Sequence, residues 1–317
     1  MSMPAVSLAP HATPVEEMSR LAARLGSSAP RLFIKRDDLL SFGCGGNKVR
    51  KMQTVVAEAR AAGADALITC GGIQSNHCRV TAAAGAALGM KVVLVVNGQP
   101  QAQPTANAKL DRLFGAEVRH VSNRDERAPA MEQAAADLRK IGFRPFIVPL
   151  GASTATGAMG FARGVAEIAA SGLKPDVIIH SSSSGGTQAG LVAGCALFGY
   201  GARVIGVSAD ESAASLSGIV KGLLDAMAAR LGAKPSTIGS DREIDVDDAH
   251  VGDGYGIPTP SSTEALELTA RSEGILLDPV YTAKAMAGLI AAVRGGRFTS
   301  EQTVLFWHTG GQVGYFA

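Results

Sequence analysis

The stretch ALITCGGIQSNHCR, residues 66–79, decides the fold class. It begins with a short apolar run of strand length, passes two glycines and four consecutive polar residues, and ends where an apolar pattern of helical period starts. A strand followed directly by a helix is the repeating unit of an α/β fold. The polar residues therefore stand at the carboxyl end of a strand, which is where open α/β sheets bind ligands.

The same unit recurs along the chain. Short apolar runs alternate with alanine-rich segments of helical length, and the runs occupy residues 32–35, 66–69, 92–96, 118–121, 146–148, 177–180, 204–207 and 304–307. Because these runs are apolar on both faces, we expect parallel strands covered by helices on both sides, and an antiparallel sandwich fits poorly. Two stretches, residues 97–107 and 239–262, look loop-rich from their proline, glycine and aspartate content.

The length of 317 residues suits two domains of ordinary size. Four of the expected strands fall between about residues 55 and 155, and a glycine-rich segment, residues 151–160, is a plausible crossing between lobes. We therefore expect a small domain at residues 51–156 and a larger, discontinuous domain formed by residues 1–50 and 157–317. The early strand at 32–35 would join the later group.

Composition excludes several classes of protein. Thirty Lys and Arg residues against 28 Asp and Glu leave a net charge of +2 with only 5% aromatics, so a nucleic-acid surface is not expected. The four cysteines form no CxxC pair, which favours reduced thiols and no metal site. Neither a signal peptide nor a run of about 20 apolar residues is present, so we expect a cytoplasmic protein without a membrane contact.

The first candidate site is SFGCGGNKVRK, residues 41–51, in which Lys48 follows a glycine turn at a helix start. The helix dipole disfavours an ammonium at this end and so favours the neutral amine that Schiff-base chemistry needs. The competing GxxxxGK[ST] phosphate loop fails, because Val49 stands where Ser or Thr is required. An ordinary solvated lysine remains an alternative.

Two further segments place polar groups between a strand and a helix. In residues 74–77, Ser75 or Asn76 could simply cap the helix, but four polar residues in succession exceed what a cap requires. In HSSSSGGTQAG, residues 180–190, small hydroxyls and glycines let backbone amides surround a phosphate, and a flexible serine linker is the alternative. The GxGxxG dinucleotide spacing is absent from this segment.

Near the C-terminus, LLDPVYTAK (276–284) and VLFWHTGG (304–311) add two more polar clusters. Each is weak evidence alone, because Tyr281 could pack with its hydroxyl at the surface and residues 309–311 could form a turn.

Together, six motifs in order closely resemble the D-cysteine desulfhydrase and 1-aminocyclopropane-1-carboxylate (ACC) deaminase family. They are GGNKVRK (45–51), GGIQSNHCR (71–79), SSSSGGTQAG (181–190), GYGIP (254–258), LDPVYTAK (277–284) and FWHTGG (306–311). This family belongs to the tryptophan synthase β-like, fold type II enzymes that use pyridoxal 5′-phosphate. The resemblance implies two open, twisted, mostly parallel sheets with flanking helices, cofactor binding by the large domain, and a homodimer.

The resemblance also implies roles for individual residues. Lys48 would carry the cofactor as a Schiff base and move the α-proton of the substrate. The other cofactor contacts would be Asn76 at the phenolic oxygen, Ser184, Gly185, Gly186 and Thr187 at the phosphate, and Thr309. The substrate, a small amino acid, would meet Gln74, Ser75, Asn76, His77 and Tyr281. Ser75, Tyr255 and Tyr281 would join Lys48 in catalysis.

The family divides at two positions, where ACC deaminases resemble one another in having Glu after the DPVY tyrosine and Leu in HLGG. Thr282 and Thr309 stand there in this chain and indicate the desulfhydrase branch, which eliminates sulfide from D-cysteine to give pyruvate and ammonia. The alternatives are ACC deaminase, L-cysteate sulfo-lyase, a β-replacement synthase, or a catalytically silent ligand-binding homologue. Cys44, Cys78 and Trp307 depart from the family pattern, and any of them could reshape the pocket.

Overall fold

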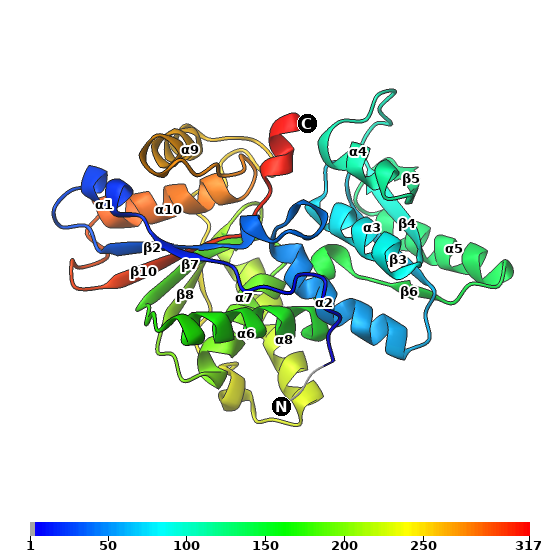
Figure 1. The fold of residues 1–317 in the computed structure, drawn as a ribbon, viewed down its shortest axis with the longest axis horizontal. Coiled ribbons are helices and arrows are strands. Elements are labelled where there is room, and N and C mark those ends of the chain that lie inside the picture. Colours follow the sequence, from blue (N-terminus) through cyan, green and yellow to red (C-terminus); the bar gives the residue numbers. More distant parts are fainter. Residues whose placement is uncertain (1–3) are drawn as a thin grey trace.

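Two sheets form the two lobes of the molecule in the computed structural model, which describes residues 4–317 (Figure 1). The larger sheet has the order β1-β2-β10-β7-β8-β9, and only β1 runs antiparallel to its neighbour. Its strands are Val15–Glu17 (β1), Arg31–Arg36 (β2), Val177–Ser182 (β7), Arg203–Ser208 (β8), Asp245–Asp247 (β9) and Thr303–His308 (β10).

The smaller sheet is wholly parallel, with the order β5-β4-β3-β6. Its strands are Ala66–Gly72 (β3), Lys91–Asn97 (β4), Glu117–Val121 (β5) and Pro145–Ile147 (β6). All eight strands that the apolar runs predict are therefore present, and the expected α/β class is confirmed.

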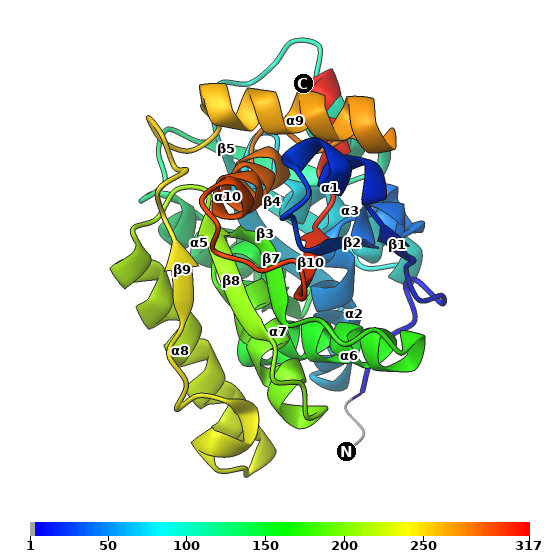
Figure 2. The ribbon, with the colours of Figure 1, turned by 90° about the vertical axis from the view of Figure 1, so that its left-hand side faces the viewer.

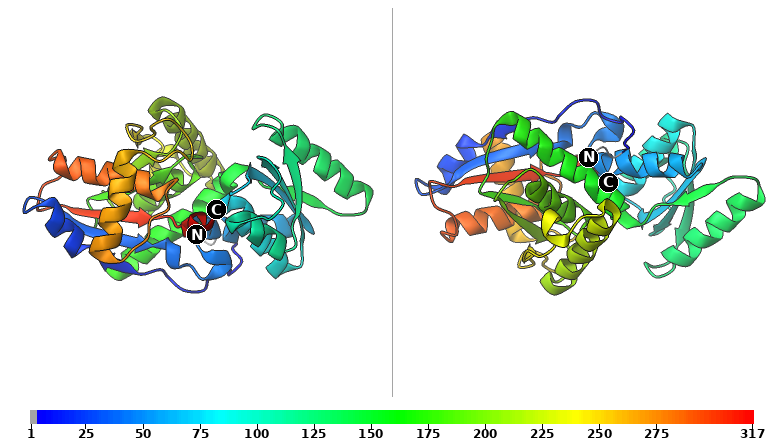
Figure 3. Two further views of the ribbon diagram at one scale, coloured as in Figure 1. Left: turned by 90° about the horizontal axis from the view of Figure 1, so that it is seen from above. Right: turned by 90° about the horizontal axis from the view of Figure 1, so that it is seen from below.

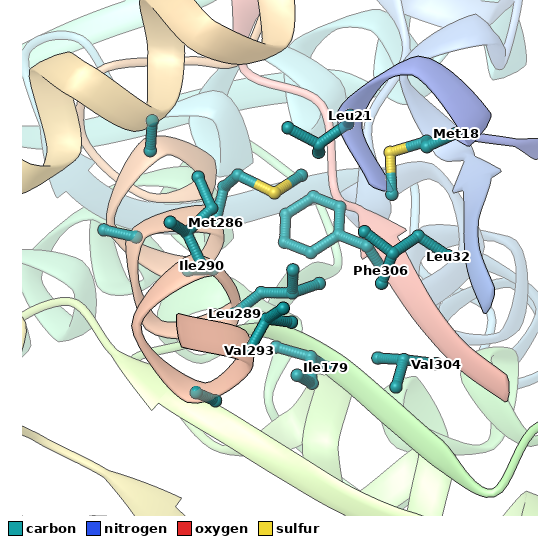
Figure 4. Packing of buried hydrophobic residues seen from close by; sticks show 14 of the residues in the cluster. Met18, Leu21, Leu32, Ile179, Met286, Leu289, Ile290, Val293, Val304 and Phe306 are labelled. Carbon is teal, nitrogen blue, oxygen red and sulfur yellow. The ribbon is translucent and has the colours of Figure 1, made fainter. Parts of the chain in front are cut away.

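Helices cover both faces of the larger sheet (Figure 2). One face packs against α1 (Ser19–Leu25), α9 (Pro260–Glu273) and α10 (Thr282–Arg294), and the other against α6 (Ala155–Ser171), α7 (Gly186–Leu197) and α8 (Ala213–Leu231). Alternate residues of β10 point to opposite sides, so Phe306 lies between Met286 of α10 and Leu32 of β2 (Figure 4) while Trp307 packs toward α6.

The smaller sheet is also covered on both faces. The helices α2 (Asn47–Ala61) and α3 (Asn76–Leu88) bury one face, α5 (Arg127–Lys140) buries the other, and α4 (Ala106–Leu113) packs beside α3. Seen from above and below, the two lobes lie side by side with α2 and α6 at their junction (Figure 3). A side chain at Gly160 of α6 would lie 2.1 Å from the carbonyl oxygen of Arg50, so the close crossing of α2 and α6 requires glycine there.

Two strands, β1 and β9, were not expected from the apolar runs. Each has only three residues, VEE and DVD, at an edge of the sheet, and neither carries a continuous apolar pattern. The stretch 239–262 is therefore not loop throughout, since it contains β9 and the start of α9. The four strands of the smaller sheet lie within residues 51–156; these domain boundaries themselves stay a proposal.

Candidate active site

A cavity of about 660 Å³ lies where residues following the strands of both sheets meet. Nine of the expected site residues line it, namely Lys48, Ser75, Asn76, His77, Ser184, Gly185, Thr187, Tyr255 and Tyr281, and Thr309 makes a tenth. Gln74 and Gly186 do not line it. The structure thus brings together segments that are separated by more than two hundred residues in the sequence.

Lys48 lies in the first turn of α2, and its position is fixed by the glycines before it. Gly45 and Gly46 have φ angles of 71° and 95°, and a Cβ on Gly45 would lie 2.6 Å from the carbonyl oxygen of Asp38. The backbone N–H of Asn47 donates to the carbonyl oxygen of Thr309 at 2.9 Å, which ties this turn to the last motif. Burial lowers the pKa of Lys48 to about 8, although the carboxylate of Asp278 acts in the opposite direction.

The side chains of the polar segment 74–77 make different contacts. Ser75 caps α3, because its Oγ accepts from the N–H of Cys78 at 3.2 Å, and it also lines the cavity. Gln74 does not support the expected substrate contact: its Oε1 accepts from the N–H of Asn107 at 3.0 Å, so the side chain points toward α4 instead. Asn76 borders the cavity at the start of α3.

His77 is buried beside the cavity, and one ring nitrogen, Nε2, lies 2.7 Å from Oγ1 of Thr69. Burial, together with the charges of Lys48 and Lys51, holds the pKa of His77 well below its usual value. The ring is therefore neutral at physiological pH and forms a polar wall without adding a positive charge to the site.

The loop between β7 and α7 forms a cup of small residues. Residues 181–185 and Thr187 line the cavity, and Gly185 adopts a φ of 75° at the start of α7. A Cβ on Gly186 would lie 2.7 Å from Oγ of Ser153 and 2.9 Å from Nζ of Lys51, so glycine is needed for this close approach even though Gly186 does not reach the cavity. Backbone amides at a helix start favour an anion at this place.

Lys51 lies beneath this cup and was not expected at the site. Its Nζ donates to Oγ of Ser153 at 3.0 Å and to the carbonyl oxygen of Gly151 at 3.1 Å, and the side chain is fully buried. Burial, and then the charge of Lys48, hold the pKa of Lys51 well below its usual value. No carboxylate within residues 4–317 pairs with this amine, so a phosphate in the cup would be the anion that stabilises its ammonium form.

One signal for Lys51 was present in the sequence. It follows Lys48 by three residues on a predicted helix, and residues at that spacing lie on the same helical face. Ser153, whose Oγ lies 2.7 Å from Oγ of Ser184, carried no such signal, because it joins the cup only through the packing of the two lobes.

Tyr255 and Tyr281 face each other at the cavity. Their hydroxyl oxygens are 2.5 Å apart, and their ring centroids are 5.7 Å apart in an edge-on arrangement. Desolvation beside Tyr281 raises the pKa of Tyr255, although 40% of that residue is exposed, and burial raises the pKa of Tyr281 well above the usual value with a further contribution from Tyr255. Both phenols are therefore protonated at neutral pH, and the pair can offer a hydrogen to a group in the cavity.

The two threonines that divide the family occupy different environments. Thr309 lines the cavity, and its Oγ1 lies 2.8 Å from Oγ of Ser181. Thr282 is fully buried outside the lining, and its hydroxyl donates to Oδ1 of Asp278 at 2.7 Å. That carboxylate also accepts from the N–H groups of residues 280–282 and so caps α10 behind Tyr281.

Two arginines from the small lobe also line the cavity, and no motif indicated them. The guanidinium of Arg124 lies 5.3 Å from the ring centroid of Tyr255, which belongs to the other lobe. Arg127 opens α5, and its Nε is buried without a hydrogen-bond partner within residues 4–317. Asp210 faces the same space, and burial raises the pKa of its carboxyl.

The three departures from the family pattern do not reshape the pocket directly. Cys44, Cys78 and Trp307 all lie outside the lining, and the indole Nε1 of Trp307 donates to Oδ2 of Asp37 at 2.7 Å. Within residues 4–317 no cluster of side chains is suited to hold a metal ion, and none of the helices there has the length and apolar character to cross a bilayer.

Comparisons with known proteins agree with this geometry. Residues 6–310 match the family described as pyridoxal-phosphate dependent enzyme. D-cysteine desulfhydrases of Yersinia pestis (strain Pestoides F) and Yersinia pseudotuberculosis serotype I are each 38% identical over 99% of this chain and 96% of their own. A crystal structure of an ACC deaminase homologue superposes with a TM-score of 0.91 and 33% identity, covering 99% of this chain and 94% of that one.

More distant structures share only the fold. A pyridoxal 5′-phosphate-dependent aspartate racemase superposes with a TM-score of 0.70 at 16% identity, over 94% of this chain and 90% of that one. The six motifs, the paired sheets and the full-length identity all lead to one conclusion: the chain belongs to the pyridoxal-phosphate-dependent enzymes of fold type II, in the D-cysteine desulfhydrase and ACC deaminase family.

Proposed function

We propose that this enzyme is a carbon–sulfur lyase that converts D-cysteine and one water into pyruvate, sulfide and ammonia. The observation that carries the proposal is the pair of hydroxyls of Tyr255 and Tyr281, which line the same cavity as the amine of Lys48. The identity of 38% to proteins named D-cysteine desulfhydrase supports the same substrate.

The residues present suit pyridoxal phosphate. The cup formed by Ser184, Gly185 and Thr187 would bind the phosphate, with Lys51 beneath it as the balancing charge and Gly186 permitting the close approach. Lys48 would hold the cofactor covalently, and Asn76 and Thr309 would contact its ring. When bound, the cofactor supplies the electron sink that makes the α-proton of an amino acid acidic.

The chain itself would supply proton transfer and orientation. An amine with a pKa of about 8 can accept and return the α-proton near neutral pH, which is the role of Lys48. The protonated tyrosines can hydrogen-bond to the departing sulfur or supply a proton to it. Ser75 and Asn76, at the start of a 13-residue helix, would receive the substrate carboxylate, and His77 would border it as a neutral wall.

A second candidate substrate is L-cysteate, whose β-substituent carries its own negative charge. Arg124 and Arg127 favour it, because both line the cavity and guanidinium groups recognise sulfonates through charge and hydrogen bonds. The arrangement gives less support to ACC deaminase activity, because Thr282 is occupied with Asp278 and does not face the cavity. A cytoplasmic location and a homodimer complete the proposal; the four free cysteines suit a reducing compartment.

The test is release of 2-oxo acid from the purified enzyme incubated separately with D-cysteine, L-cysteine, L-cysteate and ACC. Pyruvate with sulfide from D-cysteine alone is the expected result. Pyruvate with sulfite from L-cysteate would transfer the assignment to the second candidate, and 2-oxobutyrate from ACC would contradict both. The variant Lys48→Ala, with its fold checked by circular dichroism, is the control that removes the catalytic amine.

A further inference from the structure

A buried hydrogen-bond network lies behind Asn76, on the side away from the cavity. Arg79 is fully buried one turn further along α3, and Asn107 is fully buried in the first turn of α4. Nη2 of Arg79 donates to Oδ1 of Asn76 at 3.3 Å, and Nδ2 of Asn107 donates to the same oxygen at 3.0 Å. Nε of Arg79 also donates to Oδ1 of Asn107 at 2.7 Å.

The chemistry of arginine fixes the orientation of both amides. A guanidinium has only N–H donors, so the atom of each asparagine that faces Arg79 must be the carbonyl oxygen. The nitrogen of Asn107 is then directed to Asn76 and to the carbonyl oxygen of Gln74, at 2.8 Å. Rotating the Asn76 amide by a half-turn would set its NH₂ against two donors and leave a buried donor unpaired.

Only Nδ2 of Asn76 is left to face the cavity, and it donates no hydrogen bond within residues 4–317. We propose that Arg79 and Asn107 are positioning residues that hold Asn76 as an obligatory hydrogen-bond donor toward the phenolic oxygen of the cofactor. A donor at this oxygen stabilises its anionic form, whereas the reversed amide would present a carbonyl oxygen and repel it. This inference rests on the cofactor contact assigned to Asn76 in the proposed function.

Arg79 also connects Asn76 to the segment that carries Lys48. Its guanidinium donates to the carbonyl oxygens of Gly43 and Gly45, the latter at 3.2 Å, in the turn that precedes α2. One buried side chain therefore fixes, in the same rigid unit, the helix start that presents Lys48 and the amide that would contact the cofactor.

The test is a pH titration of the absorbance of the bound cofactor in Asn107→Asp, compared with Asn76→Ala and the unaltered enzyme. The aspartate keeps the shape of Asn107 and can still accept from Arg79, but it replaces the donor facing Asn76 with an acceptor. We expect the Asn76 amide to reverse, because the new carboxylate is a stronger partner for its NH₂ than the 3.3 Å contact from Arg79 is for its oxygen. The apparent pKa of the bound cofactor should rise by about one unit in Asn107→Asp and in Asn76→Ala, since a hydrogen bond to a charged group is of this size.

Gln302→Glu is the matched control, because Gln302 uses only its side-chain oxygen, which accepts from the N–H of Thr299 at 2.9 Å. It should leave the titration unchanged. Burial raises the pKa of Asp111, a neighbour of Arg79, to about 7, so all variants are compared over the same pH series. Asn107→Ala, which removes the donor without adding charge, is the second variant if Asn107→Asp does not fold; a smaller upward shift is expected there, because the N–H of Arg79 still holds the Asn76 carbonyl oxygen.

The outcomes distinguish the cofactor contact of Asn76 from the positioning role of Arg79 and Asn107. A shift in Asn76→Ala without a shift in either Asn107 variant would overturn the positioning role and leave the cofactor contact intact. An unchanged titration in Asn76→Ala would rule out the contact between Asn76 and the cofactor, and with it the positioning role of Arg79 and Asn107. The proposed lyase activity is tested separately, by pyruvate release from D-cysteine.

Discussion

Lys48 and Tyr281 line one cavity, and Lys51 lies just beneath it. Burial lowers the pKa of both lysines and raises the pKa of the tyrosine, so it favours the neutral form of each side chain. For the two lysines the neutral form is a free amine, and for the tyrosine it is a protonated phenol. Burial thus lowers the positive charge that the two lysines hold in the apoprotein, and a bound phosphate would change the protonation most at Lys51, whose pKa is held furthest below its usual value.

Capture of the cofactor by the apoprotein should depend on pH through Lys48. Only the neutral amine attacks an aldehyde, and a pKa lowered to about 8 leaves roughly 10% of it neutral at pH 7 and roughly 90% at pH 9. The rate should therefore rise across this interval and level off above it, measured by stopped-flow absorbance. Nα-acetyl-lysine, whose side-chain amine has its ordinary pKa, is the reference that accounts for titration of the cofactor itself. If the rate depended on pH in the same way for Lys48 and for this free amine, the lowered pKa of Lys48 would be contradicted.

Tyr281→Phe should reduce turnover far more than cofactor binding. It removes the hydroxyl that hydrogen-bonds to Tyr255 but retains the ring, and loss of a general acid or orienting group costs about 10²-fold or more in kcat. The measurement is kcat with D-cysteine beside the absorbance of the bound cofactor. Tyr315→Phe, which removes a hydroxyl bonded to the carbonyl oxygen of Leu277 outside the cavity, is the control. Equal activity in both variants would make Tyr281 a packing residue only.

Lys51→Met should weaken cofactor binding by about tenfold or more, because the phosphate loses its balancing charge. The apoprotein should melt no lower than before, since the substitution removes a buried amine that no carboxylate pairs with in residues 4–317. Affinity is measured by titrating apoprotein with pyridoxal phosphate, and melting by calorimetry. A lower apoprotein melting temperature with unchanged affinity would show that Lys51 serves only the carbonyl oxygen of Gly151 and the hydroxyl of Ser153.

Strands with a continuous apolar run could be predicted from the sequence, and short edge strands could not. The run at 92–96 differs from β4 by one residue at each end, because a parallel strand buried on both faces must be apolar throughout. In contrast, β1 and β9 are three-residue edges in which acidic residues outnumber valine, and backbone pairing with a neighbour defines them. Such pairing leaves no signal in local periodicity.

The same distinction between local and long-range signals applies to the candidate active site. The positions of Lys48 and Ser75 at the cavity could be predicted because each belongs to a local motif that determines its own turn or cap, and that of Tyr281 could be predicted from the resemblance of the six ordered motifs to the family. Arg124 could not, because it enters the cavity only when the loop after β5 approaches Tyr255 of the other lobe. Gln74 lies outside the cavity lining because Asn107 of α4, 33 residues further along the chain, engages its side chain, and local sequence carries no signal for such a contact.

The junction of the lobes also contains a buried ionic network centred on Asp37, the residue that follows β2. Its carboxylate accepts from Oγ1 of Thr13, from Nε and Nη2 of Arg50 in α2, and from Nε1 of Trp307, at 2.7–2.9 Å. Arg50 in turn donates to Glu167 of α6 at 2.6 Å. The network therefore joins the helix that carries Lys48 to the core of the large lobe.

Asp37→Asn should destabilise the apoprotein by about 3–5 kcal/mol, the usual cost of removing one partner of a buried ion pair. An amide has one accepting oxygen, so its NH₂ would face at least one of the four donors that the carboxylate now satisfies. The measurement is urea unfolding of the apoprotein. Glu264→Gln, in a pair with Arg294 that is half exposed, should cost less than about 1 kcal/mol. Similar losses in the two variants would mean that the network adds no more to the junction than a surface ion pair, and that apolar packing of α2 against α6 alone holds the lobes together.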